Sequence, residues 1–422
     1  ALFAVALSLC AVLLGLALLC PSCGRRAGAH DVSGSPGGSR ALRLETAGGA
    51  TAAPPGAAAP PPPAPPPPEE AGARGAADPV DLRLAHLLLP LTNLSSLSTA
   101  ALLDSHPGIT PAEARQVVRL HQELYCRSQA RGGAPPKGAR PVPFGNVTLY
   151  TYARDDIVSA SIGQQHTWEL PEIREMLWAM RAPVPPPDDG GPPAGGGPLA
   201  GRAGWRAPAS AFVVDVGANI GWFTLNAAAA GGTVAAFEAM PSNIALLRAS
   251  LCANPWLMAR VALYGTGLGT RREACAIISS RANTGDGHTV CGDAAGERAA
   301  QSGGGEYELR GSISVMRLDS LVDRDVQVVK LDVEGYEMEV LSGAAALLRQ
   351  RRVWYLLTEC NVGILGEGRA RAYLRFLAGS GYAISTGPFL DAALLESGAA
   401  ALPPGDAPTL YCARRELVGA AD

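Results

Sequence analysis

An apolar segment that runs into a glycine-containing turn limits the possible folds of this chain most strongly. Residues 212–216 read Phe-Val-Val-Asp-Val, and Gly217 and Gly221 follow in a turn that leads into a helical pattern. Further along, a second apolar segment, residues 233–237, ends in Glu238. This order of strand, glycine turn, helix, strand and acid is typical of α/β sheets that hold a nucleoside. In such sheets the backbone approaches the ligand at the glycines, and the acid accepts hydrogen bonds from the ribose.

The glycine turn does not match the fingerprint of dinucleotide-binding folds. The pattern G-x-G-x-x-G, started at Gly217, would place glycine where the chain has Asn219 and Trp222. The observed spacing suits a nucleoside without a pyrophosphate, and S-adenosylmethionine is the commonest such ligand. An ordinary strand-to-helix turn capped by Asn219 is the alternative. We therefore expect the cofactor S-adenosylmethionine to be bound by Asp215, Gly217, Asn219, Gly221 and Glu238.

Apolar segments with strand character alternate with helical patterns from residue 211 onward. Strands are expected near residues 212–216, 233–237, 260–264, 312–318, 326–332, 353–359, 382–386 and 409–414. Helices are expected near residues 219–230, 241–253, 337–350 and 368–379. This alternation predicts an α/β fold of the Rossmann-like, doubly wound type, with a mostly parallel seven-stranded sheet. Residues 270–310 are rich in Gly, Ser and charge, and are expected to form a loop over the active face.

Composition changes abruptly along the chain. Residues 1–20 contain no charged residue and would reach about 30 Å as a helix, which predicts a signal anchor or, alternatively, a cleaved signal peptide. Residues 27–78 are rich in Pro, Ala and Gly and are expected to form a disordered stalk. Residues 79–182 are expected to be an extension of helices and strands, residues 183–204 a disordered insertion, and residues 205–416 the nucleoside-binding domain.

The extension contains two local signals. Thr110-Pro-Ala-Glu113 is a capping box that predicts a helix, and residues 147–162 read as short strands. A further helix is expected from Glu172 to Met180. Trp168 and Glu169 precede the nucleoside-binding domain and could close over the cofactor.

Carboxylates gather where the strand predicted near residues 326–332 ends. Asp332, Glu334 and Glu337 follow one another closely, and Glu359 ends the next apolar segment. Parallel strands would bring these groups to one edge of the sheet, where they repel one another unless a proton transfer, a metal or a ligand uses them. We expect Glu337 to cap the following helix. The predicted catalytic residues are Asp332, Glu334 and Glu359. A divalent cation bound by the same carboxylates is the alternative, and the spacing does not separate the two.

The overall charge argues against a nucleic-acid partner. The chain has 35 Lys and Arg against 38 Asp and Glu, which gives a net charge of −3 and an isoelectric point near 6.1.

Among its nine cysteines, Cys275 and Cys291 could be bridged or could equally be free thiols. Asn93 and Asn146 begin tripeptides that can be glycosylated in a lumen. We expect membrane attachment through residues 1–20 and a place in the secretory pathway, in the Golgi lumen or, after cleavage, outside the cell.

Together these motifs resemble the FkbM family of methyltransferases. The resemblance rests on Asp215–Gly221, Phe237–Asn243, Leu318–Leu321, Val329–Glu337, Val340–Gly343 and Glu359. It runs from about residue 211 to residue 387, inside the domain expected at 205–416. It implies a Rossmann-like fold, S-adenosylmethionine as the methyl donor, and methylation of a hydroxyl, often on a sugar or a polyketide. The family's acid-Pro pair after the second strand is here Glu238-Ala239, with the proline displaced to position 241.

The sequence therefore predicts an S-adenosylmethionine-dependent methyltransferase that methylates a hydroxyl of a glycan or another small acceptor. A nicotinamide-dependent oxidoreductase on the same fold is one alternative, and the absence of glycine at position 219 argues against it. A catalytically inactive, stalk-mounted surface protein is the other. The presence of Asp215, Glu238, Asp332 and Glu334 argues against that alternative.

Overall fold

The computed structural model describes residues 99–100, 103, 108–129, 135–186, 205–292, 306–389, 394–395, 402 and 408–418. These residues all belong to one compact unit, Ala73–Asp422. The predicted anchor and stalk, residues 1–20 and 27–78, lie outside the described residues, as does most of the predicted insertion. None of the helices in the described part of the chain combines the length and apolar character needed to cross a membrane.

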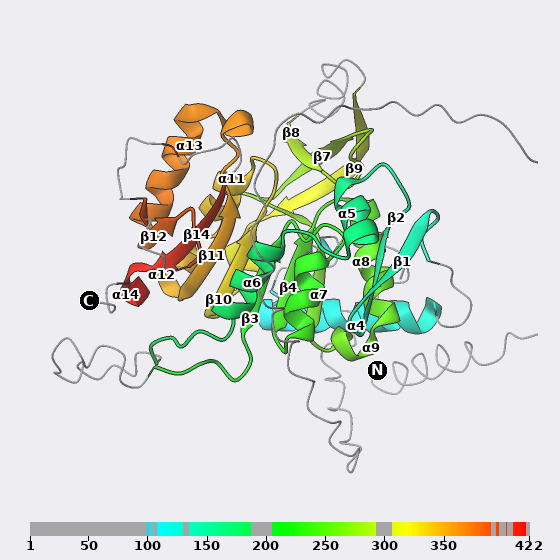
Figure 1. The fold of residues 1–422 in the computed structure, drawn as a ribbon, viewed down its shortest axis with the longest axis horizontal. Helices are drawn as coiled ribbons and strands as arrows, with labels where there is room; N and C mark the ends of the chain where they lie inside the picture. Colours follow the sequence, from blue (N-terminus) through cyan, green and yellow to red (C-terminus); the bar gives the residue numbers. More distant parts are fainter. Residues whose placement is uncertain are drawn as a thin grey trace, which may run out of the picture. The chain divides into compact units, whose positions relative to one another are not determined.

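A mixed sheet of eight strands forms the centre of the fold (Figure 1). Its strands are β3 (Phe212–Val216), β4 (Thr233–Glu238), β5 (Val261–Gly265), β10 (Val326–Leu331), β11 (Val353–Glu359), β12 (Tyr382–Ser385), β13 (Leu394–Leu395) and β14 (Thr409–Arg414). Their order is β13-β12-β14-β11-β10-β3-β4-β5. The strands from β5 to β11 are parallel, whereas β14 runs antiparallel to both of its neighbours. The predicted α/β architecture is confirmed, but the sheet is mixed and has a short additional edge strand, β13.

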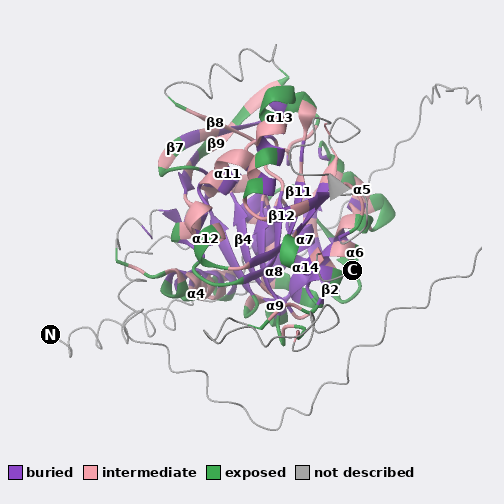
Figure 2. Ribbon diagram, turned by 90° about the vertical axis from the view of Figure 1, so that its left-hand side faces the viewer, coloured by how far each residue is buried: buried purple, intermediate pink, exposed green. Residues whose placement is uncertain are grey.

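The central strands are buried on both faces. Every residue of β3 and of β10 is buried, and in β11 only the terminal Glu359 is partly exposed. Runs of Val and Leu without polar alternation are typical of parallel strands covered by helices on both sides, and they explain why these strands were predicted closely. Figure 2 shows these buried strands enclosed by helices.

Helices cover the two faces of this sheet. One core cluster includes residues of α6 (Leu170–Ala179), α7 (Trp222–Ala229), α8 (Pro241–Ala253), α9 (Pro255–Met258) and α14 (Arg415–Val418). The other includes residues of α4 (Pro111–Gln129), η2 (Leu318–Ser320), α11 (Glu337–Ser342), α12 (Ala345–Gln350) and α13 (Val362–Gly379). The prediction of a single helix for residues 337–350 was wrong, because the chain forms two helices there, α11 and α12. At the break Gly343 O accepts from Asp319 N at 3.2 Å, and Asp319 Oδ2 accepts from Ala346 N at 3.0 Å.

A second, four-stranded sheet replaces much of the loop predicted for residues 270–310. It consists of β6 (Gly267–Leu268), β7 (Glu273–Ser280), β8 (His288–Cys291) and β9 (Tyr307–Met316), in the order β6-β9-β7-β8. The loop prediction was wrong because a few apolar side chains suffice to form a small core under this sheet. Ile277, Ile313 and Val315 are buried against Met240. Cys275 and Cys291 face each other across β7 and β8 and form a disulfide.

The extension packs on the central fold as part of the same unit. The capping box is confirmed, since Glu113 Oε2 accepts from Thr110 N at 2.9 Å and Thr110 Oγ1 accepts from Glu113 N at 3.2 Å. After α4 come the hairpin β1 (Ala139–Phe144) and β2 (Val147–Tyr152) and the helix α5 (Ile157–Gln165). The strand prediction was wrong for residues 157–162, because Asp156 Oδ2 accepts from Ser159 N at 2.8 Å and caps a helix there.

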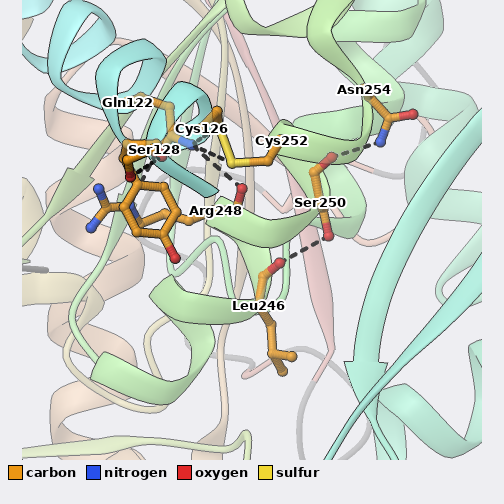
Figure 3. The surroundings of a disulfide bond; sticks show 9 residues. Gln122, Cys126, Ser128, Leu246, Arg248, Ser250, Cys252 and Asn254 are labelled. Carbon is orange, nitrogen blue, oxygen red and sulfur yellow. Dashed lines mark hydrogen bonds between the residues drawn. A yellow bond between two sulfur atoms is a disulfide. The ribbon is translucent and has the colours of Figure 1, made fainter. Parts of the chain in front are cut away.

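A second disulfide joins the extension to the central fold (Figure 3). It connects Cys126 of α4 with Cys252 of α8, which are 126 residues apart in the sequence. Beside it, Gln122 Nε2 donates to Arg248 O at 3.4 Å, and the guanidinium of Arg248 lies 3.8 Å from the ring centre of Tyr125. This covalent link fixes α4 against α8, although the spacing of the two cysteines carries no sequence signal.

Candidate functional site

Two cavities lie at the carboxyl ends of the parallel strands. The larger cavity has a volume of about 630 Å³ including its open mouth, and its walls include Gly217, Asn219, Phe237, Glu238, Asp332 and Glu334. The strands that deliver these residues, β3, β4 and β10, are neighbours in the sheet. Open α/β sheets bind ligands at this edge. The structure therefore brings the glycine turn, the acid after β4 and the acids after β10 to one place.

The glycine turn, residues 217–221, approaches the acid loop, residues 332–337, so closely that a side chain at position 217 would not fit. Gly217 has φ +74°, and a Cβ atom there would lie 1.8 Å from Asp332 O. Gly221 has φ +97°, and a Cβ atom there would lie 2.3 Å from Leu247 Cδ1. Asn219 adopts φ +50°, which a small polar side chain tolerates. Both glycines are therefore required by the backbone and by close packing.

Glu238 lies in the larger cavity with its carboxylate held by the backbone. Its Oε2 accepts from Asn219 N at 2.7 Å, and its Oε1 accepts from Ala239 N at 2.9 Å and from Met240 N at 2.7 Å. Burial raises the pKa of Glu238 to about 7, although these three backbone donors oppose the shift. Glu238 therefore fixes the glycine turn relative to β4 and presents a carboxylate edge to the cavity.

Asp215, predicted to bind the cofactor, lies behind the cavity and is not part of its lining. The residue is 1 % exposed, and its Oδ2 accepts from Thr224 Oγ1 at 2.5 Å. Burial raises the pKa of Asp215, and the ammonium of Lys330 opposes this shift. From this position Asp215 supports the turn through α7 and β10.

Lys330 is a buried cation at the centre of the site. Its Nζ donates to Asp332 Oδ2 at 3.1 Å and to Gly217 O at 3.4 Å, and it lies 4.9 Å from the ring centre of Phe223. Burial lowers the pKa of this ammonium, but the carboxylates of Asp332, Asp215 and Glu169 raise it more, so that the pKa lies above its ordinary value. Lys330 thereby joins the glycine turn to the acid loop.

The three predicted catalytic carboxylates meet beside this lysine. One oxygen from each of Asp332, Glu334 and Glu359 lies within 4.8 Å of the others. Burial, followed by the carboxylates of Asp332 and Asp286, raises the pKa of Glu334 well above its usual range. Burial and the Asp332 carboxylate raise the pKa of Glu359 to about 8.

Two sets of donors near these carboxylates could hold a metal ion. One consists of Asp332, Glu334 and Glu359, and the other of Asp286, His288 and Glu334. Glu334 belongs to both sets and lines the larger cavity, so an ion bound by Glu334 would lie at the edge of that cavity.

Glu337 has a structural place in the acid loop. It is 1 % exposed, and its Oε1 accepts from Val333 N at 3.2 Å and from Gly335 N at 3.1 Å. Burial raises the pKa of Glu337 to about 7. Its carboxylate thus holds the turn that carries Asp332 and Glu334.

The smaller cavity lies on the other side of Asp332. It has a volume of about 310 Å³, and its polar lining consists of Glu169, Glu172, Lys330, Asp332, Thr358, Glu359 and Thr409. Asp332 is the residue that lines both cavities. Burial raises the pKa of Glu169 to about 7, whereas the ammonium of Lys330 opposes the shift.

Sequence reasoning missed part of this site. Glu169 was expected near the cofactor, but it lines the smaller cavity instead. Glu172 and Thr409 were not selected, because they are close only after α6 and β14 have packed on the sheet. Asp286 lies within residues 270–310, which were read as a loop, and was not selected. Lys330 stood within a selected motif, and a lysine inside a buried strand was a signal that could have been used.

Comparison with known proteins places a family domain on this geometry. Residues 215–384 match the family model described as the methyltransferase FkbM domain. No curated protein matches the chain.

The solved structures that the chain matches are only distantly similar to it. Methyltransferase FkbM from Methylobacillus flagellatus KT is 18 % identical with a TM-score of 0.29, and the match covers 48 % of this chain and 43 % of that protein. Precorrin-6y C5,15-methyltransferase from Geobacter metallireducens GS-15 is 12 % identical with a TM-score of 0.25, over 51 % of this chain and 84 % of that one. TYW2 from P. horikoshii, in complex with MeSAdo, is 11 % identical with a TM-score of 0.29, over 71 % of this chain and 83 % of that one. This chain thus spans less than half of the FkbM methyltransferase from Methylobacillus. The similarity to the methyltransferase FkbM domain thus extends over residues 215–384.

Proposed function

We propose that this protein transfers a methyl group from S-adenosylmethionine to a hydroxyl of a glycan or another small acceptor. The FkbM domain supports methyltransferase activity. One observation carries the proposal furthest: Asp332 forms part of the wall of two adjacent cavities. A group transfer needs two ligands that meet at one point, and this carboxylate marks that point.

The larger cavity suits a nucleoside that carries no phosphate. Phe237 supplies an apolar wall, and the Glu238 carboxylate can accept from ribose hydroxyls. Asp332 and Glu334 provide carboxylates that favour a positive sulfonium or ammonium. Among the described residues that line this cavity there is no Lys or Arg for a pyrophosphate, which argues against the nicotinamide alternative. We propose that Gly217, Asn219 and Glu238 hold the cofactor and that Asp215 supports them through Thr224. Gly221 is not part of the cavity lining, and it lets the turn pack closely on Leu247.

The acceptor hydroxyl needs a base, and Glu359 is placed for that role. Asp332 is paired with Lys330, whereas the carboxylate of Glu359 accepts no hydrogen bond from the described side chains and faces the smaller cavity. S-adenosylmethionine, when bound, supplies a methyl group on a positive sulfur that becomes a neutral thioether. The acceptor oxygen forms its bond to the methyl carbon while its proton passes to Glu359. Asp332 orients the acceptor between the two cavities, and Glu334 faces the cofactor side.

Two disulfides are compatible with the proposed secretory location. Disulfides persist mainly in oxidising compartments, and both Cys126–Cys252 and Cys275–Cys291 are formed here. Asn146 is exposed at the turn between β1 and β2, where a glycan could be attached. We therefore propose that the described unit lies in the lumen of the secretory pathway and that residues 1–20 attach it to the membrane.

Calorimetry combined with a transfer assay tests the proposed function. The purified full chain should bind S-adenosylmethionine, and Glu238→Gln should weaken that binding about 10-fold or more by removing one charge from the ribose site. Glu359→Gln should lower turnover by about 10²-fold or more while leaving cofactor affinity nearly unchanged, whereas Asp332→Asn should lower turnover and also weaken cofactor binding, because Asp332 lines both cavities. Glu416→Gln, at an exposed position on α14, is the matched control. Binding of a nicotinamide cofactor in place of S-adenosylmethionine would contradict the proposal.

A further inference from the structure

Three of the ten residues that line the smaller cavity come from parts of the chain outside the FkbM match. Glu169 and Glu172 come from the start of α6, and Thr409 comes from β14, whereas the matched domain covers residues 215–384. Its space of about 310 Å³ includes its open mouth, so the enclosed part is small. If the proposed methyl transfer is correct, this cavity receives the acceptor, so acceptor choice depends on the extension as well as on the domain.

The wall formed by the extension is held in place by contacts with the sheet and with α7. Thr409 Oγ1 donates to Glu172 Oε1 at 3.3 Å. Gln327 Nε2, from β10, donates to Ala179 O at the end of α6 at 2.8 Å. Trp222 Nε1, at the start of α7, donates to Trp168 O at 2.8 Å, directly before Glu169. These contacts anchor both ends of α6, so the wall has a defined position relative to Asp332.

The lining of the smaller cavity has an excess of negative charge. It contains the carboxylates of Glu169, Glu172, Asp332 and Glu359. The single cation of the lining, Lys330, is 6 % exposed and already paired with Asp332 at 3.1 Å. A ligand carboxylate or phosphate entering here would meet several like charges without a free cation, which disfavours it strongly.

The remaining lining offers what an uncharged hydroxyl-bearing ligand needs. Phe223, Leu331 and Leu357 give apolar surface, and Thr358 and Thr409 give hydroxyls. Carboxylates also accept hydrogen bonds from ligand hydroxyls without needing a ligand charge. The cavity therefore combines many acceptors for O–H donors with apolar surface for a compact ring.

We infer that the smaller cavity binds a compact, hydroxyl-bearing acceptor without negative charge and rejects anionic ones, and that Glu169 and Glu172 of the extension contribute to this selection. The two residues act on the acceptor directly, as part of the wall it touches. Selection against anions therefore depends on the extension as well as on the matched domain, which supplies Asp332 and Glu359.

The rejection of anions should strengthen as the pH rises. Burial raises the pKa of Glu169 to about 7, so this residue gains charge between about pH 6 and pH 8. The charged and titratable groups that face Glu169 are Glu172 of α6, Lys330 of β10, Asp332 of the acid loop, Glu359 of β11 and Tyr411 of β14. Lys330 keeps its charge over this range because its pKa is raised.

A set of three probes that differ only in charge tests the inference. The probes are a methyl hexoside, the matching methyl hexuronide and the matching amino hexoside. Their binding to the full chain is measured by saturation-transfer NMR with S-adenosylhomocysteine present, and their methylation by transfer from labelled S-adenosylmethionine. We expect the neutral hexoside to bind and react, and the hexuronide to be at least about 10-fold worse at pH 8.5, a difference of about 1.4 kcal/mol.

Variants assign the selection to the extension. Glu169→Gln combined with Glu172→Gln should reduce the discrimination against the hexuronide by about 3-fold or more while cofactor affinity stays unchanged. Glu175→Gln is the matched control, because Glu175 lies on the same helix but accepts from Phe389 N outside the cavity. The control should keep the discrimination of the wild type.

The outcomes separate this inference from the proposed function. A chain that fails to bind S-adenosylmethionine contradicts the proposed function. A chain that binds it but accepts the hexuronide as well as the hexoside, or binds none of the probes, overturns the inference. Discrimination that is the same at pH 6 and pH 8.5 also overturns it.

Discussion

Replacing Lys330 with methionine removes a buried ammonium while keeping an unbranched side chain of similar length. Lys330 is 6 % exposed, and its Nζ pairs with Asp332 Oδ2 at 3.1 Å. Its positive charge also lowers the pKa values of Asp215 and Glu169, which burial raises. Removing one partner of a buried ion pair typically costs about 3–5 kcal/mol, because the other charge remains buried. We expect a loss of that size in the free energy of unfolding of Lys330→Met at pH 8.

The loss should be smaller at pH 5, and the sign follows from the pKa shifts. The folded-state pKa of Lys330 is raised, so its own contribution is complete below its unfolded pKa near 10 and is constant between pH 5 and pH 8. The raised pKa values of Glu169 and Asp215 mean that these acids take up protons as the pH falls towards 5, which leaves less negative charge uncompensated in the variant. One pKa unit corresponds to about 1.4 kcal/mol, so the loss at pH 5 should be smaller by at least that amount.

Urea unfolding of the full chain at the two pH values measures this effect. Lys330→Arg is the control, because a guanidinium keeps the charge within reach of Asp332, and it should recover most of the stability at pH 8. An equal loss at both pH values, or a loss below about 1 kcal/mol at pH 8, would refute the assignment of Lys330 as the charge that balances these acids.

Three further predictions follow from the same structure. Replacing Cys126 and Cys252 with serine should lower the free energy of unfolding by roughly 5 kcal/mol, and removing the disulfide between β7 and β8 should lower it by roughly 3 kcal/mol. The difference is expected because the first bond closes a loop of 126 residues and the second a loop of 16 residues. Similar losses would contradict the loop-length argument. The rate of methyl transfer should rise with pH up to about 8, as Glu359 ionises, and Glu359→Gln should remove this slope; a variant that keeps the slope excludes Glu359 as the base. Gly217→Ala should weaken cofactor binding in calorimetry by about 10-fold or more. Gly231→Ala should not weaken it, because Gly231 has a similar positive φ but open space for a Cβ atom. Equal effects of the two substitutions would mean that backbone strain alone is responsible.

The elements that sequence predicts well are those whose signal is local and strong. β11 and α8 were predicted with the observed bounds, because a continuous apolar segment ends in an acid in the first case and a proline begins a helical pattern in the second. The acids Asp332, Glu334 and Glu359 were expected to meet because parallel neighbouring strands end at one edge. This reasoning needs only strand order.

The parts that were missed depend on contacts between distant residues. The strand β7 and the first part of β9 are polar on one face, and a small cluster around Met240 supplies most of their burial, so their composition resembled that of a loop. The second part of β9 was predicted as a strand near residues 312–318, but it lies in the second sheet. The helix α5 begins at Asp156, whose cap outweighs a pattern of β-branched residues that read as a strand. The place of Glu169 beside Lys330 follows from how α6 crosses the sheet, which spacing along the chain does not encode.

The bond between Cys126 and Cys252 also sets a condition on biosynthesis. At ordinary rates of translation of about 5–20 residues per second, the 126 residues between them take roughly 6–25 s to be made. During that time the thiol of Cys126 has no native partner, while Cys10, Cys20 and Cys23 already precede it in the chain. A nascent chain entering an oxidising compartment would therefore depend on a disulfide isomerase to keep α4 available for α8, and premature pairing would release a protein whose α4 is tied to the wrong segment.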